Sequence, residues 1–242
     1  MSFIGDVVAT FRPASDDRHG PLVPLLVALT LLTGLVDAVS YLKLGHVFVA
    51  NMTGNVVFLG FALAGAGGLS VASSLLSLCA FMLGALAGGW LGARQVHRGH
   101  LLRAAGGVQA SLIALALLLA LIADAPISKG VSYGLVVVLA LAMGVQNAAA
   151  QRLAVPELTT TVLTKTLVGI AAEGSLVGGH GANVGRRTVS VVAMLLGALT
   201  GGALVLHVSL AAPLAVAFAV SIAVGVTAHV VSRSNAAWTT RA

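Results

Sequence analysis

Long apolar segments recur along the whole chain, separated by short hydrophilic gaps. A helix needs about 20 apolar residues to cross the hydrocarbon of a bilayer. Six segments are long enough, at about 21–43, 70–93, 101–123, 131–151, 187–206 and 209–231. Two shorter apolar segments, at about 52–66 and 159–174, begin with polar residues. Segments of that length are more typical of re-entrant or buried helices than of full crossings.

The composition also indicates a polytopic membrane protein. Hydrophobic residues make up 58% of the chain and charged residues only 8%, whereas soluble domains carry roughly 25% charged residues. We expect a polar leader at 1–20, membrane repeats at 21–123 and 131–231, and a polar tail at 232–242. The leader carries charged residues ahead of any long apolar run, so we expect no cleaved secretory signal.

The arginines distinguish eight crossings from six. Short loops rich in Arg and Lys mark the cytoplasmic side of a membrane protein. If all eight segments cross, some arginines fall outside whichever way the chain starts. With six crossings, two re-entrant segments and both termini inside, all ten arginines become cytoplasmic. We therefore predict a multi-pass protein of the inner (plasma) membrane, with both termini cytoplasmic, whose partner is the lipid bilayer and not nucleic acid.

The two halves of the chain share small and polar positions in the same order. Asp37 in the first half matches Asn147 in the second, and Thr53 matches Thr164. Three crossings in each half would orient the halves oppositely, which is the inverted-repeat plan of many transporters. We predict an all-α integral membrane fold of two inverted repeats, with six spanning helices and two shorter broken or re-entrant helices.

Glycine-rich strings at 84–89 and 197–202 also match between the halves. Small residues at spacings of three to five let membrane helices approach closely. These strings predict close helix packing, either within the chain or in a homo-oligomer.

Polar residues are costly inside a bilayer, so their placement marks a candidate site. Asp37 lies within the first span, and polar clusters open both short segments. The predicted substrate-binding or coupling residues are Asp37, Asn51, Thr53, Asn55, Asn147, Thr164 and Lys165. Asp37 is either a cation or proton site or the structural partner of a buried base such as Lys165. Asn51 and Thr53 either cap the first short helix or leave its positive N-terminus facing a ligand.

The strings Gly34–Ala38 and Val47–Asn55 resemble the YoaK family of bacterial integral membrane proteins, the type with domain of unknown function 1275. The later strings Gly144–Ala148 and Thr160–Thr166 resemble that family's second signature, with Lys165 where glycine is expected. The resemblance covers about residues 20–232. It implies a membrane location and this fold, but no activity.

These patterns favour a small transporter or permease of unknown substrate, with proton coupling through Asp37. Two alternatives stay open: a passive channel, and a non-transporting assembly or sensory protein in which Asp37 is structurally paired. The sequence shows no nucleophile elbow, phosphate loop or haem-ligand set, and its histidines lack metal-ligand spacing. We expect neither enzyme activity nor a cofactor or metal. The single cysteine, Cys79, excludes an internal disulfide.

Overall fold

The computed structural model describes residues 3–13, 17–123, 126–155, 158, 163–172, 184–233 and 237–239. These residues form helices and loops, without a strand among them. Six of the helices are long and apolar enough to cross a membrane. They are α2 (Leu22–Lys43), α4 (Val71–Arg94), α5 (Arg98–Leu121), α6 (Lys129–Leu153), α8 (Val184–His207) and α9 (Ala211–Val231). The all-α membrane fold with six long helices is thereby confirmed.

Three further helices are too short to span. α3 (Met52–Leu63) and α7 (Leu163–Ala172) are the two short apolar helices expected from the sequence. α1 (Phe3–Phe11) lies in the segment predicted as a polar leader and packs against the start of α8. Thr160 and Thr161, in the polar stretch that opens the second short segment, lie outside the described residues.

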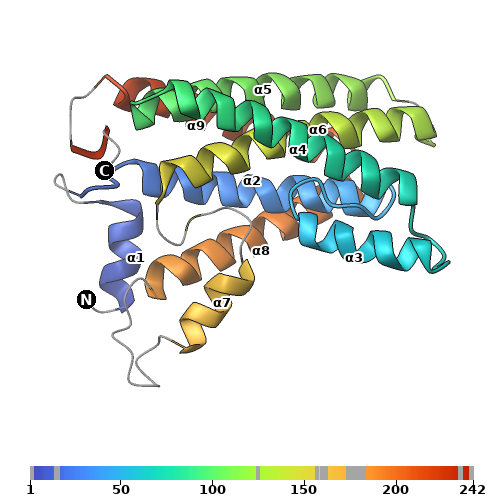
Figure 1. Cartoon of the computed structure of the whole chain (residues 1–242), viewed down its shortest axis with the longest axis horizontal. Coiled ribbons are helices and arrows are strands. Elements are labelled where there is room, and N and C mark those ends of the chain that lie inside the picture. The colour runs from blue at the N-terminus through green and yellow to red at the C-terminus, as the bar shows by residue number, and fades with distance from the viewer. Residues whose placement is uncertain are drawn as a thin grey trace.

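The central helices are α2 and α6, and the other long helices surround them (Figure 1). Most of α2 is buried, including Leu26, Leu32 and Leu35. The outer helices expose large apolar side chains such as Leu86 on α4 and Leu199 on α8. Apolar side chains pointing outward are expected where lipid is the solvent, so these faces contact the bilayer.

Glycines set the closest helix contacts in the bundle. Gly84 of α4 packs on the backbone of Leu141 in α6, and Gly197 of α8 packs on the backbone of Leu31 in α2. Conversely, Gly144 of α6 packs on the backbone of α4, and Gly34 of α2 packs on the backbone of α8. The predicted role of the glycine strings in helix packing therefore operates within one chain.

Several helices begin or end together at one end of the bundle. The guanidinium of Arg98, at the start of α5, donates to the carbonyls of Arg18, Leu153 and Trp238. The start of α2, the end of α6 and the segment after α9 therefore lie together there. α1 and the starts of α5 and α8 occupy the same end (Figure 1). We call it the arginine end, because the described arginines lie near it.

This arrangement makes both short helices part of re-entrant excursions. α2 ends at the far end of the bundle and α4 starts there, so residues 44–70 enter and leave at that end. α6 ends and α8 starts at the arginine end, so α7 belongs to an excursion from the opposite side. Corresponding helices of the two halves thus run in opposite directions. A two-fold relation between the halves stays a prediction.

Candidate functional site

Asp37 holds a non-helical stretch of chain inside the bundle. It lies on the buried face of α2 and is 4% exposed. The amides of Val49 and Ala50 both donate to its Oδ1 atom, each at 2.9 Å. Backbone amides within a bilayer need such partners because no water is available to them. Asp37 therefore fixes the segment that leads into α3.

Asn55 holds the same segment from the other side. Its Oδ1 accepts from the amide of Phe48 at 2.8 Å, and its Nδ2 donates to the Phe48 carbonyl at 2.6 Å. Ser77 of α4 donates to that carbonyl at 2.6 Å and accepts from the Asn55 amide at 3.1 Å. All hydrogen-bonding atoms of Asn55 thus serve the protein itself.

The first turn of α3 has no side-chain cap. Asn51 occupies the N-cap position, yet its side chain accepts no hydrogen bond from that turn. Gly54 lies against the ring of Phe48, where a methyl group would be 2.8 Å from the ring carbons. The N-terminus of α3 therefore carries its partial positive charge at the inner end of the excursion. Of the two readings of Asn51, capping is wrong.

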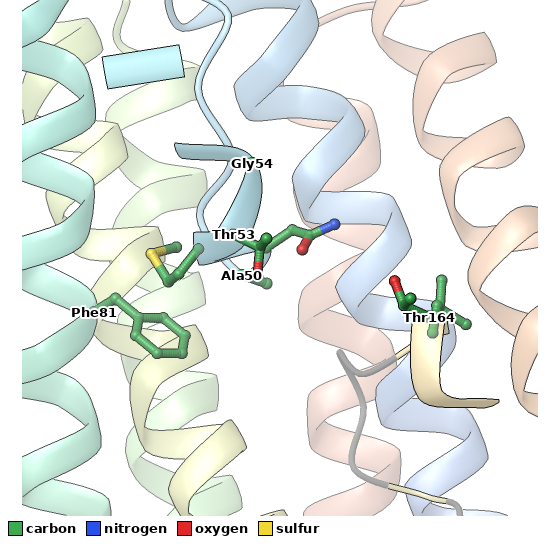
Figure 2. A pocket seen from close by; sticks show the side chains of 8 residues that line it. Ala50, Thr53, Gly54, Phe81 and Thr164 are labelled. Carbon is green, nitrogen blue, oxygen red and sulfur yellow. The ribbon is translucent and has the colours of Figure 1, made fainter. Parts of the chain in front are cut away.

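A cavity of about 640 Å³ lies where the two short helices begin. Its lining comes from the segment before α3, from the first turn of α3, from α4 and from the start of α7. The lining residues are Ala50, Asn51, Met52, Thr53, Gly54, Phe81, Leu163 and Thr164. Figure 2 shows Ala50, Thr53 and Gly54 on one side, Thr164 across from them, and Phe81 on α4. The N-termini of α3 and α7 thus meet at one cavity, although they enter from opposite ends of the bundle.

Three of the seven predicted site residues gather at this cavity. Asn51 and Thr53 line it from one excursion and Thr164 from the other. Asp37 and Asn55 are absent from the lining and instead hold the chain that forms it. Asn147 and Lys165 are also absent from it.

Lys165 is exposed on α7 and forms no ion pair with Asp37 in the described residues. Oδ1 of Asp37 accepts from two amides, and its Oδ2 is buried without a hydrogen-bond partner there. Of the two alternatives for Asp37, the pair with Lys165 is therefore absent from the described residues. Asn147 donates to the carbonyl of Met143 one turn earlier in α6.

Several residues that shape the cavity or link the helices were missed by the sequence reasoning. Ser77 and Phe81 of α4 belong to the loop contacts and the cavity. Gln109 of α5 donates to Gln146 of α6, which donates to Thr33 of α2 at 2.8 Å and so links three helices. Serines and glutamines within predicted spans are the signal that could have found Ser77 and Gln109. No group of three His, Cys, Asp or Glu side chains that could hold a metal occurs in the described ranges.

The six long helices and the paired excursions define a multi-pass α-helical membrane protein. Residues 25–227 match the family described as a protein of unknown function (DUF1275), and the chain belongs to that family. It is 33% identical over 148 residues to the UPF0700 transmembrane protein YoaK of Bacillus subtilis (strain 168). That match covers 60% of this chain and 64% of the length of the relative. No solved structure matches the chain. The resemblance found in the sequence is thereby confirmed.

Proposed function

We propose that the protein is a permease of the bacterial inner membrane, which moves a small molecule through the cavity between α3 and α7. The observation that carries the proposal is the position of that cavity. Its walls come from two excursions that enter from opposite ends of the bundle. A solute bound there would contact both, so a small relative movement of the two walls would open it to one side or the other.

The lining favours a substrate that is partly apolar and carries hydrogen-bonding groups. Asn51, Thr53 and Thr164 offer neutral polar groups, while Met52, Phe81 and Leu163 offer apolar surface. The two helix N-termini add positive ends of backbone dipoles, which suit hydrogen-bond acceptors of the substrate. The described lining carries no charged side chain, and a fully ionic substrate would need one or more counter-charges to leave water.

A non-transporting role is the second candidate, and one observation favours it. Asp37 is engaged by backbone amides, as a purely structural carboxylate would be. That role does not account for a cavity lined from both excursions. In either case we place the arginine end in the cytoplasm, on the positive-inside rule.

Uptake by reconstituted vesicles tests the permease. Purified protein would be exposed to a library of small metabolites, with and without a proton gradient. We expect at least one compound to enter faster than in protein-free vesicles. Thr164→Val should lower that uptake about tenfold, because loss of one substrate hydrogen bond removes on the order of 1 kcal/mol or more.

Thr227→Val is the matched control, since Thr227 is exposed on α9 and does not line the cavity. Its uptake should equal that of the wild type. Folded protein that moves no compound would contradict the permease and favour the non-transporting role. An equal loss of uptake in Thr164→Val and Thr227→Val would show that the substrate does not pass through the cavity.

A further inference from the structure

The wall of the cavity on the α3 side is held by side chains rather than by regular secondary structure. Residues 47–51 form no helix, and Ala50 and Asn51 line the cavity directly. Asp37 binds the amides of Val49 and Ala50, and Asn55 binds both backbone groups of Phe48. The position of the wall therefore depends on these two side chains.

Only one of the two carboxylate oxygens of Asp37 is hydrogen-bonded in the described residues. Oδ1 accepts both amide hydrogen bonds, while Oδ2 is buried with no hydrogen-bond partner in the described residues. Hydrogen bonds to an ionised acceptor are roughly twice as strong as those to a neutral one. Oδ2 can therefore take up a proton without competing with either amide for Oδ1. The proton would neutralise the carboxylate and weaken both amide hydrogen bonds at once.

Asp37 is also the only acidic side chain placed in the interior of the described bundle. On its own helix and the following loop, the ionisable residues Tyr41, Lys43 and His46 lie toward the far end. The ionisable groups on the helices that pack against α2 are Asp6 on α1, Lys129, Tyr133 and Arg152 on α6, Arg186, Arg187 and His207 on α8, and His229 on α9. None of them forms a hydrogen bond or ion pair with the Asp37 carboxylate in the described residues, so a proton there would act on the loop alone.

We propose that Asp37 is a proton-controlled latch on the cavity wall: ionised Asp37 holds residues 49–50 in place, and protonated Asp37 releases them. Asn55 is the part of the attachment that does not titrate, so the loop stays anchored at Phe48 when the latch opens. The use of this latch for coupled transport rests on the proposed function. The latch itself does not, because it can be observed without any substrate.

A nitroxide spin label tests the latch directly. The label would be attached to Thr53→Cys in a Cys79→Ala background, because Thr53 is exposed in the first turn of α3. The protein would be held in lipid nanodiscs while the pH falls from about 8 to about 5. We expect the mobile fraction of the label to rise by about twofold or more, because the bonds at Asp37 weaken. A label at Leu63→Cys, at the other end of α3, should not respond.

Asp37→Asn supplies the decisive comparison, because an amide oxygen accepts as a neutral group at every pH. Its label at position 53 should be mobile throughout and insensitive to pH. A wild-type label that ignores pH would overturn the latch, as would the same pH response in Asp37→Asn. If Asp37→Asn does not fold, the test is the pH response of the two labels in the protein with Asp37. A response at position 53 and none at position 63 supports the latch, and equal responses overturn it. If the label responds to pH through Asp37 but the protein moves no compound in the vesicle assay, only the proposed permease function is rejected.

Discussion

At the scale of single residues, polar side chains in this bundle do two different jobs. Asn51, Thr53 and Thr164 face a cavity, whereas Asp37 and Asn55 satisfy the backbone that shapes it. Both jobs require a polar residue at depth, because unsatisfied backbone groups and unsatisfied ligand groups are both costly in hydrocarbon. Polarity in the sequence therefore locates the site but does not assign the roles within it.

Asn55→Ala isolates the backbone role. The substitution leaves the partly buried amide of Phe48 without its acceptor, while Ser77 still donates to the Phe48 carbonyl. An orphaned buried group costs about 1–3 kcal/mol, so the variant should unfold at a lower temperature than the wild type. Thermal melting in detergent would measure the change. Ser111→Ala, which removes an exposed hydroxyl on α5, should melt like the wild type. Equal melting of Asn55→Ala and the wild type would show that the loop does not need this anchor.

At the scale of helices, the closest packing is made by matched glycines. A methyl group on Gly34 would overlap the backbone of Met194 in α8, and one on Gly144 would overlap the backbone of Phe81 in α4. Helix backbones are not flexible side chains, so neither contact can be relieved by a rotamer change. Both helix pairs must separate to admit even an alanine.

Gly34→Ala and Gly144→Ala should therefore each destabilise the bundle, by at least the 1–3 kcal/mol that is typical of overpacking. Gly89→Ala is the matched control, because a methyl group there meets nothing within 4 Å. It should be neutral or slightly stabilising, since alanine favours helix over glycine. The yield of monodisperse protein and its melting temperature would report all three. Normal behaviour of either Gly34→Ala or Gly144→Ala would contradict the described helix contacts.

The elements themselves were largely predictable from hydrophobic length. The six spanning helices and the two short ones follow from apolar runs. The arginine positions favoured excursions over two further crossings, and the membrane orientation stays a prediction. The helix α1 was missed, because nine residues with mixed polarity give no spanning signal. The pairing of Asp37 with Lys165 failed because a sequence pattern does not show where unpaired backbone amides will lie. In the structure the amides of Val49 and Ala50, rather than Lys165, bind the carboxylate of Asp37.

At the scale of the whole molecule, one arginine gathers both ends of the chain. Buried Arg98 donates to the carbonyls of Arg18, Leu153 and Trp238, and its Nη2 lies 3.2 Å from Nδ1 of His19. Gly20 packs on the ring of Trp238, at a distance where a methyl group would be 3.0 Å from it. Residues 18–20 and Trp238 are therefore docked together, next to the end of α6.

This docking should depend on pH through His19. Burial, and then the charge of Arg98, lowers the pKa of His19 from 6.5. The docked histidine is neutral, which leaves Nδ1 free to accept from Arg98. Because the undocked histidine keeps the higher pKa, it binds protons first as the pH falls. Docking is therefore fully stable above pH 6.5 and weakens progressively below it, toward the lowered pKa of the docked state.

The fluorescence of Trp238, measured in a Trp90→Phe background, would follow the docking as the pH is lowered. We expect Trp238 to become accessible to a soluble quencher as the pH falls below 6.5, the ordinary pKa of His19. His19→Gln keeps an acceptor for Arg98 but cannot titrate, so its Trp238 should stay shielded across the same range. A pH response that persists in His19→Gln would assign the effect to a group other than His19. Shielding that never changes in the protein with His19 would show that the other hydrogen bonds of Arg98 are sufficient to hold the two ends of the chain together.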